Sequence, residues 1–238
     1  MSPWSGASEA KPRPARLTTN RSPHPSTESG QLQLASACAA AASEITTSKH
    51  EGPLKRLLNG NERFVAGRVT QSSRDAKRRA EVAEGQKPFA ILVSCSDSRV
   101  GPEVVFDQGL GDIFVVRSAG HVVDAVGLGS IEYAVEHLGP SLILVLGHER
   151  CGAVGAAVAG GEAHAHLPAV LDAIRPAVAK AKSEPGDVLD NAVRAQVREV
   201  VEQLQAAEPL LSERVKAGKL KVVGARYDLD SGRVEVLK

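Results

Sequence analysis

Several chemically reactive residues directly follow an apolar segment of the sequence. In "ILVSCSDSRV", Cys95 ends the apolar run, and Asp97 and Arg99 stand within four residues of it. A second apolar run ends in "VLGHERCG", which contains His148 and Cys151. Thiolate sulfur and imidazole nitrogen are the ligands that zinc prefers in proteins. The two segments therefore predict one metal site, provided that the fold brings them together.

Two cysteines and one histidine supply three protein ligands. Structural zinc sites use four, whereas catalytic sites use three and keep the fourth position open. Cys151 also precedes "GAVGAAVAGG", a segment expected to be helical, and the positive end of a helix dipole favours a thiolate. The alternative interpretation is that both cysteines are small buried hydrophobic residues and that His148 caps a strand.

Asp97 and Arg99 offer a second set of interactions beside the predicted ligands. An aspartate two residues from a ligand can become a fourth ligand or accept a hydrogen bond from a bound water. The arginine can hold that carboxylate away from the metal through a bidentate pair. The alternative is a surface pair that only stabilises a turn.

The elements that must position these residues follow from the apolar pattern. Continuous apolar runs typical of strands buried on both faces occupy 88–94, 112–120, 141–147 and 219–229. The alternating segment 231–237 is expected to pair with the fourth run as a hairpin. Helical spacing is found at 53–67, 74–86, 126–139, 151–161 and 191–217. This order predicts an α/β fold, with a mostly parallel central sheet of four to five strands flanked by helices.

Functional sites in such sheets gather beyond the carboxyl ends of the strands, where Cys95 and the His148–Cys151 pair are expected. The chain has 238 residues and a net charge of +1, which supports neither a nucleic acid nor a membrane surface as partner. Three cysteines are too few for a disulfide scaffold and suit a reduced compartment. No apolar stretch approaches the roughly 18 residues needed to cross a bilayer.

Residues 1–50 differ from the rest in being rich in Ser, Pro and Thr, and they predict an N-terminal extension before a single domain at 51–238. Two interpretations of the extension stand: a disordered tail and an organelle-targeting segment. A cytoplasmic location is expected, with an organelle as the alternative. Cys38 falls in this extension and is left out of the predicted site.

Together, "CSDSRV" and "GHERCG" resemble the β-class carbonic anhydrases, and the resemblance covers about 53–237. It implies the same α/β fold and reversible hydration of carbon dioxide to bicarbonate and a proton. It also implies one Zn²⁺ per chain on Cys95, His148 and Cys151, with Asp97 and Arg99 as the catalytic pair. In some members the aspartate moves onto the metal at low pH and closes the site.

The resemblance also implies a substrate pocket assembled between two subunits of a homodimer or homotetramer. By position, its lining residues are Gln86, Phe114, Ala119, Tyr133 and Gly152. Many members carry an asparagine where this chain has His121, which is expected at the site entrance. There it is either a harmless substitution or a group that helps to export the proton. His164 and His166 are expected in a solvated loop without a role.

Other functions remain open at this level. Hydrolysis of carbon disulfide or carbonyl sulfide on the same scaffold would use the same motifs. A non-catalytic zinc-stabilised binding module would need a fourth permanent ligand, which the Asp97–Arg99 pair and Gln86 argue against. A thiol redox protein is disfavoured because the sequence contains no C-x-x-C motif.

Overall fold

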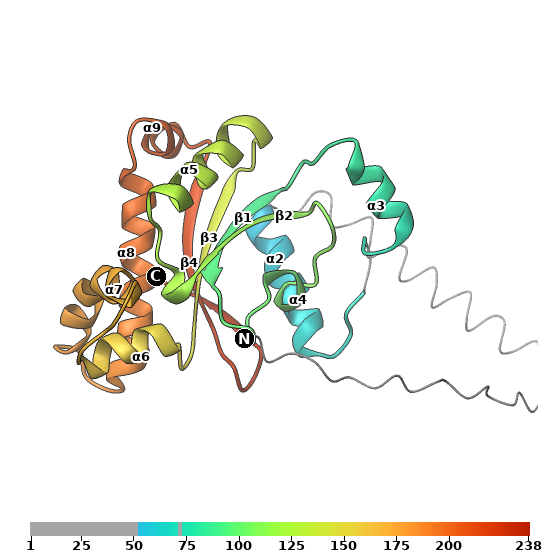
Figure 1. Cartoon of the computed structure of the whole chain (residues 1–238). Coiled ribbons are helices and arrows are strands. Elements are labelled where there is room, and N and C mark those ends of the chain that lie inside the picture. The colour runs from blue at the N-terminus through green and yellow to red at the C-terminus, as the bar shows by residue number, and fades with distance from the viewer. Residues whose placement is uncertain (1–51, 71–72) are drawn as a thin grey trace, which may run out of the picture. The chain divides into compact units, whose positions relative to one another are not determined.

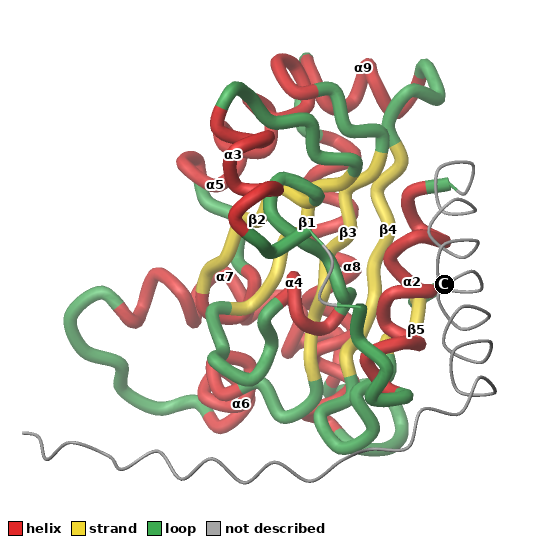
Figure 2. Tube along the Cα trace, turned by 90° about the vertical axis from the view of Figure 1, so that its right-hand side faces the viewer, coloured by secondary structure: helices red, strands yellow, loops and turns green. Residues whose placement is uncertain are grey.

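A computed structural model describes residues 52–70 and 73–238. The extension predicted for residues 1–50, with Cys38, lies outside the described residues. The described chain forms a five-stranded sheet in the order β2-β1-β3-β4-β5 (Figure 2). The first four strands in this order are parallel, and β5 runs antiparallel to β4. The strands are β1 (Ala90–Cys95), β2 (Ile113–Ser118), β3 (Leu142–His148), β4 (Lys221–Tyr227) and β5 (Val234–Val236). This arrangement confirms the predicted α/β class and the terminal hairpin.

Helices cover both faces of the sheet (Figure 1). One face packs against α5 (Ala125–Tyr133), η3 (Ala134–Leu138), α8 (Val188–Ala206) and α9 (Leu210–Lys216), and the other against α2 (Pro53–Val65) and α4 (Pro102–Val105). Beside them lie α3 (Ala76–Ala83), the short turn η2 (Ala119–His121), α6 (Gly152–Ala159) and α7 (Leu167–Ala181). None of the helices in the described chain is long and apolar enough to cross a membrane.

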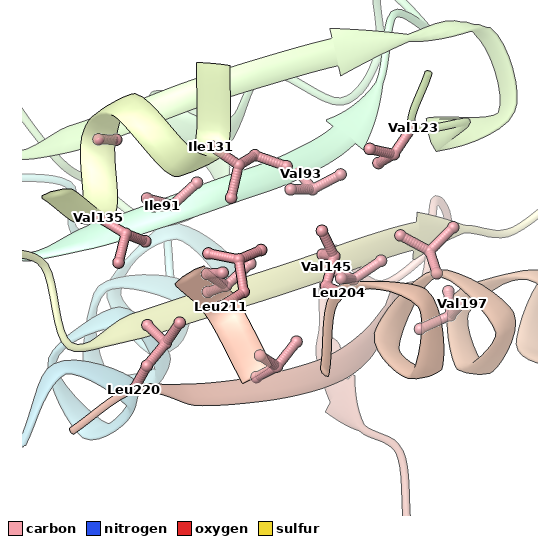
Figure 3. Packing of buried hydrophobic residues seen from close by; sticks show 14 residues of the cluster. Ile91, Val93, Val123, Ile131, Val135, Val145, Val197, Leu204, Leu211 and Leu220 are labelled. Carbon is pink, nitrogen blue, oxygen red and sulfur yellow. The ribbon is translucent and has the colours of Figure 1, made fainter. Parts of the chain in front are cut away.

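The two-residue period of the strands divides the core between these faces. Figure 3 shows Ile91 and Val93 of β1 beside Ile131 and Val135, and Val145 of β3 beside Leu204 of α8, all in one buried cluster. The alternate residues of the same strands, such as Leu92 and Leu144, face α2 and α4. Both sets are buried, which explains why the strands are continuous apolar runs rather than alternating ones.

Two helical segments differ from the prediction. The apolar spacing at 191–217 predicts one helix, but the structure has two, because α8 ends at Ala206 and α9 begins at Leu210. Pro209 lies between them, and proline lacks the N–H that a continuous helix needs. Helix α7 occupies a stretch for which the sequence pattern predicts no element. His164 and His166 are exposed before it, as predicted.

Candidate metal centre

The fold brings the three predicted metal ligands together at the carboxyl edge of the sheet. Cys95 ends β1, and His148 ends the neighbouring strand β3. Cys151 is the N-cap residue of α6, which begins after the short loop that follows β3. Their ligand atoms all lie within 4.8 Å of one another, and the two Sγ atoms are 3.9 Å apart. The cluster could therefore hold a metal ion.

Burial and hydrogen bonding at the cluster suit a metal. Cys95, Cys151 and His148 are 5%, 1% and 0% exposed. His148 Nδ1 lies 2.9 Å from the backbone oxygen of Glu149, whereas Nε2 is buried without a hydrogen-bond partner. When Nδ1 carries the proton and donates it to this carbonyl, Nε2 presents a lone pair toward the sulfurs. Two thiols and one imidazole form a donor set that fits zinc.

The two thiols differ in the direction of their pKa shifts. A hydrogen bond from Cys151 lowers the pKa of the Cys95 thiol, and the same contact, with burial, raises the pKa of Cys151. The backbone N–H of Gly120, in the turn η2, points at Cys95 Sγ from 3.4 Å and also favours its thiolate. The Gly120 contact therefore favours the thiolate form of Cys95.

Asp97 is held by Arg99 at the edge of the cluster. Arg99 Nε and Nη2 donate to the two carboxylate oxygens at 2.9 and 2.7 Å, and the Arg99 backbone N–H adds a third bond at 2.9 Å. These bonds lower the pKa of the Asp97 carboxyl well below its usual range. Asp97 Oδ2 lies 3.8 Å from His148 Nε2, so the carboxylate stands beside the cluster without entering it.

A further arginine, which the motifs do not predict, supports the loop after β1. Arg117 of β2 donates to the backbone oxygens of Cys95, Asp97 and Val100 at 2.9, 2.7 and 3.0 Å. It lies just before the end of an apolar strand, and an arginine in that position is the only sequence signal for this role. Arg117 thereby sets the course of the chain between the candidate ligand Cys95 and Arg99.

The residues that the resemblance places in a substrate pocket divide into two groups. Ala119 lies in η2, directly before Gly120, and Gly152 follows Cys151 at the start of α6, so both are near the cluster. Gln86 precedes β1 and is exposed, at the opposite end of the sheet from Cys95.

Phe114 and Tyr133 also lie away from the cluster of their own chain. Phe114 pairs with Ile91, four residues before Cys95 along β1, which is about 13 Å of strand. Tyr133 ends α5, is 51% exposed, and contacts His137 with ring centroids 5.0 Å apart. One chain therefore does not gather all five of the predicted pocket residues around its own cluster.

The expectation for His121 is wrong, because the structure buries it rather than placing it at an entrance. The side chain is 0% exposed, and neither ring nitrogen has a hydrogen-bond partner. Gly120 before it has φ +64°, and the ring lies near Gly147 of β3, where a Cβ would stand 3.5 Å from His121 Cε1. Burial lowers the pKa of His121 to about 4.

Comparison with known proteins identifies the family. The family model described as carbonic anhydrase matches residues 90–234, which include the whole cluster. Carbonic anhydrase 2 of Mycobacterium tuberculosis is 47% identical over 183 residues, which are 75% of this chain and 88% of that protein. The chain belongs to the β-carbonic anhydrase family. The carbonic anhydrase of Mycolicibacterium smegmatis is 41% identical over 186 residues, covering 76% of this chain and 90% of the relative.

The solved structures agree with this membership. The β-carbonic anhydrase of Coccomyxa, in complex with acetazolamide, matches with a TM-score of 0.63 and 28% sequence identity. The match covers 79% of this chain and 87% of that chain. The β-carbonic anhydrase fold is therefore common to both proteins, and the cluster lies in the part of the chain that the family model covers.

Proposed function

We propose that this protein catalyses the reversible hydration of carbon dioxide to bicarbonate and a proton, with one Zn²⁺ per chain on Cys95, His148 and Cys151. The observation that carries the proposal is the geometry of Asp97. Its carboxylate is bound to Arg99, so the ion-binding group among the described residues comprises three donors. Three donors leave one coordination position for water, as the catalytic zinc pattern requires.

Zinc in this position supplies Lewis-acid activation of water near neutral pH. The surrounding side chains then have separate tasks. Asp97, ionised and fixed by Arg99, accepts a hydrogen bond from the attacking water and orients it. Because its pKa is lowered, Asp97 keeps its charge throughout the neutral range. Arg99 holds the carboxylate off the metal, so that the open position stays available to water and product.

We assign substrate binding to the remaining predicted residues. Phe114, Ala119 and Tyr133 would give carbon dioxide an apolar surface, while the Gln86 amide donates to the oxygen that becomes negative. Gly152, without a side chain, leaves room beside Cys151. Gln86, Phe114 and Tyr133 lie far from the cluster of their own chain, so they serve the cluster of a second copy.

This assignment makes the enzyme an obligate homodimer, alone or as half of a homotetramer. The surface around these residues supports the proposal. Strand β2 is the edge strand of the sheet and is only partly buried. On the neighbouring helix α5, Val126 is 77% exposed and Tyr133 51%, and a second copy packed on β2 and α5 would cover both apolar side chains.

Stopped-flow measurement of carbon dioxide hydration between about pH 6 and 9, with zinc quantified on the same sample, tests the function. The expected result is activity proportional to zinc content. Full activity in a zinc-free preparation would overturn the proposal. Parallel assays with carbon disulfide and carbonyl sulfide address the competing chemistry, and turnover of these gases without carbon dioxide hydration would also overturn it. Sedimentation analysis measures the oligomeric state of the same preparation.

A further inference from the structure

Glu149 joins the metal loop to the C-terminal hairpin through both its backbone and its side chain. It follows His148 directly, and its backbone N–H donates to the oxygen of Tyr227 at 2.9 Å. Its carboxylate accepts from the backbone N–H of Leu229 at 3.2 Å. The other carboxylate oxygen lies 3.8 Å from Arg226 Nη2 and 3.2 Å from Arg150 Nη1. Glu149 is therefore held in place by residues of β4 and of the turn that follows β4.

The backbone oxygen of the same residue is the hydrogen-bond partner of His148 Nδ1, at 2.9 Å. A ligand histidine depends on such a partner, because the partner fixes the tautomer and the angle of the ring. Any rotation of the 149 peptide would turn the imidazole and move Nε2 away from the two sulfurs. The contacts of the Glu149 side chain oppose this rotation.

We propose that Glu149, together with Arg226, is a positioning residue that holds His148 in its metal-binding orientation. The inference rests on the proposed zinc function, since it assigns a role toward that metal. Neither residue touches the cluster itself. Their effect reaches the metal through the 149 carbonyl and the His148 ring, so it should appear in zinc affinity before it appears in any step of the reaction.

Arg226 is suited to this task because it is nearly buried and already fixed. Its side chain is 11% exposed, and Nε and Nη1 are bound to Asp190 of α8 at 2.5 Å and Asp228 at 3.3 Å. A guanidinium held by two carboxylates cannot move away when the Glu149 carboxylate approaches. The pairs of Asp190 and Glu235 with Arg194 extend the same network to β5. The side chain of Glu149 is 21% exposed, so its contacts are only partly weakened by solvent.

The network offers matched variants that separate positioning from general stability. Glu149→Ala removes all three side-chain contacts, whereas Glu149→Gln retains an acceptor for Leu229 and loses the charge that faces Arg226 and Arg150. Glu235→Gln is the control, because it breaks the Arg194 pair at 2.8 Å at the far end of the same network. The full-length zinc-loaded protein is used for all three variants.

Zinc dissociation constants are measured by competition with a chelator, and the d–d spectrum of the cobalt-substituted protein reports ligand geometry. We expect Glu149→Ala to weaken zinc binding about tenfold, the lower end of the range for outer-shell partners. The cobalt bands should shift with it. Glu149→Gln should show a smaller loss, about threefold, and Glu235→Gln should bind zinc as the parent does. Urea unfolding of the apo proteins measures any loss of fold separately.

Two results would overturn the inference. One is parental zinc affinity and an unchanged cobalt spectrum in Glu149→Ala. The other is an equal loss in Glu235→Gln, which would show a general effect of the charge network. If the alanine variant does not fold, the glutamine variant decides in its place, and parental affinity there also refutes positioning. A parent that binds no zinc would overturn the proposed function and this inference together.

Discussion

Asp97 and Arg99 form a bidentate ion pair beside the candidate metal-binding cluster. The two side-chain bonds measure 2.9 and 2.7 Å, and the Arg99 backbone N–H donates a third. Residues only two positions apart achieve this because the chain turns after Cys95, where the backbone of Val100 also donates to the oxygen of Asp97 at 3.0 Å. With the carboxylate held by Arg99, the candidate cluster consists of the three donors Cys95, His148 and Cys151.

Replacing Asp97 by alanine should keep the metal and slow the reaction. The ligand set remains, but the attacking water loses its acceptor, and we expect turnover to fall about 10- to 100-fold. Zinc content and stopped-flow rates are measured on the same samples. Asp172→Ala, which removes an exposed pair with Arg175, is the control and should match the parent. A variant of Asp97 that bound zinc and kept the parental rate across pH would refute its role.

Loss of a single ligand should remove both zinc and activity. Cys95→Ala and His148→Ala each leave two donors, too few for a stable site, so zinc content should fall to background after dialysis. Ser96→Ala, exposed beside Cys95, is the matched control and should retain the metal. Treating the parent with a chelator should abolish the activity, and adding zinc should restore it. Activity that survives complete zinc removal contradicts the assignment.

Acid should destabilise the fold through His121. Its ordinary pKa is about 6.5, and burial lowers the pKa to about 4 in the folded protein. Between these values the unfolded chain binds more protons than the folded one. The contribution of neutral His121 is therefore complete above about pH 6.5 and is lost as pH falls through about 4, a change of about 3 kcal/mol.

The measurement for His121 is urea unfolding of the chelator-treated protein at pH values from about 7.5 to 4, so that zinc release does not contribute. His121→Asn carries no titrating group and should lose less stability on acidification. The difference between the parent and this variant isolates the histidine. Parallel pH profiles for the two proteins would show that the imidazole is not desolvated as its burial indicates.

Gly147, next to the candidate ligand His148, should not tolerate a side chain. Its Cβ would lie 2.5 Å from Val197 Cγ2 and 3.1 Å from Val193 Cγ1, both on α8. Gly147→Ala should therefore lower the free energy of unfolding by about 1–3 kcal/mol through overpacking. Gly155→Ala in α6 is the control, because a Cβ there meets only Leu189, at an ordinary contact distance of 3.8 Å, and α6 gains helix propensity. Equal stability of the two variants in urea would contradict the packing seen between β3 and α8.

Much of the fold could be predicted because local pattern reflects burial. The four runs that become β1 to β4 are apolar on both faces, and the hairpin of β4 and β5 follows from one turn and one alternating segment. The prediction of a single helix at 191–217 was wrong because the apolar spacing continues across Pro209. Apolar periodicity carries no information about the backbone N–H that proline lacks. Helix α7 has an interior proline, Pro176, which weakens its pattern.

The candidate site was partly predictable for the same reason. Donor chemistry is a property of residue type, so Cys95, His148 and Cys151 stood out from their surroundings. His121 did not, because whether an imidazole faces solvent depends on how distant segments of the chain pack around it. Arg117 and Glu149 were missed because their contacts are with residues distant in sequence. Arg117 donates to the backbone oxygen of Cys95, and the Glu149 carboxylate accepts from Leu229 in the C-terminal hairpin.

The sequence by itself determined the class of the fold, the carboxyl strand ends at which reactive residues stand, and the types of donor present. These features depend on the local spacing of apolar residues and on the chemistry of individual side chains. Only the tertiary structure decided that β1 and β3 are neighbours and that His121 is buried. It also decided that Asp97 binds Arg99 with its Oδ2 3.8 Å from His148 Nε2. These relations depend on long-range packing, in which each side chain takes the space and partners that other segments leave.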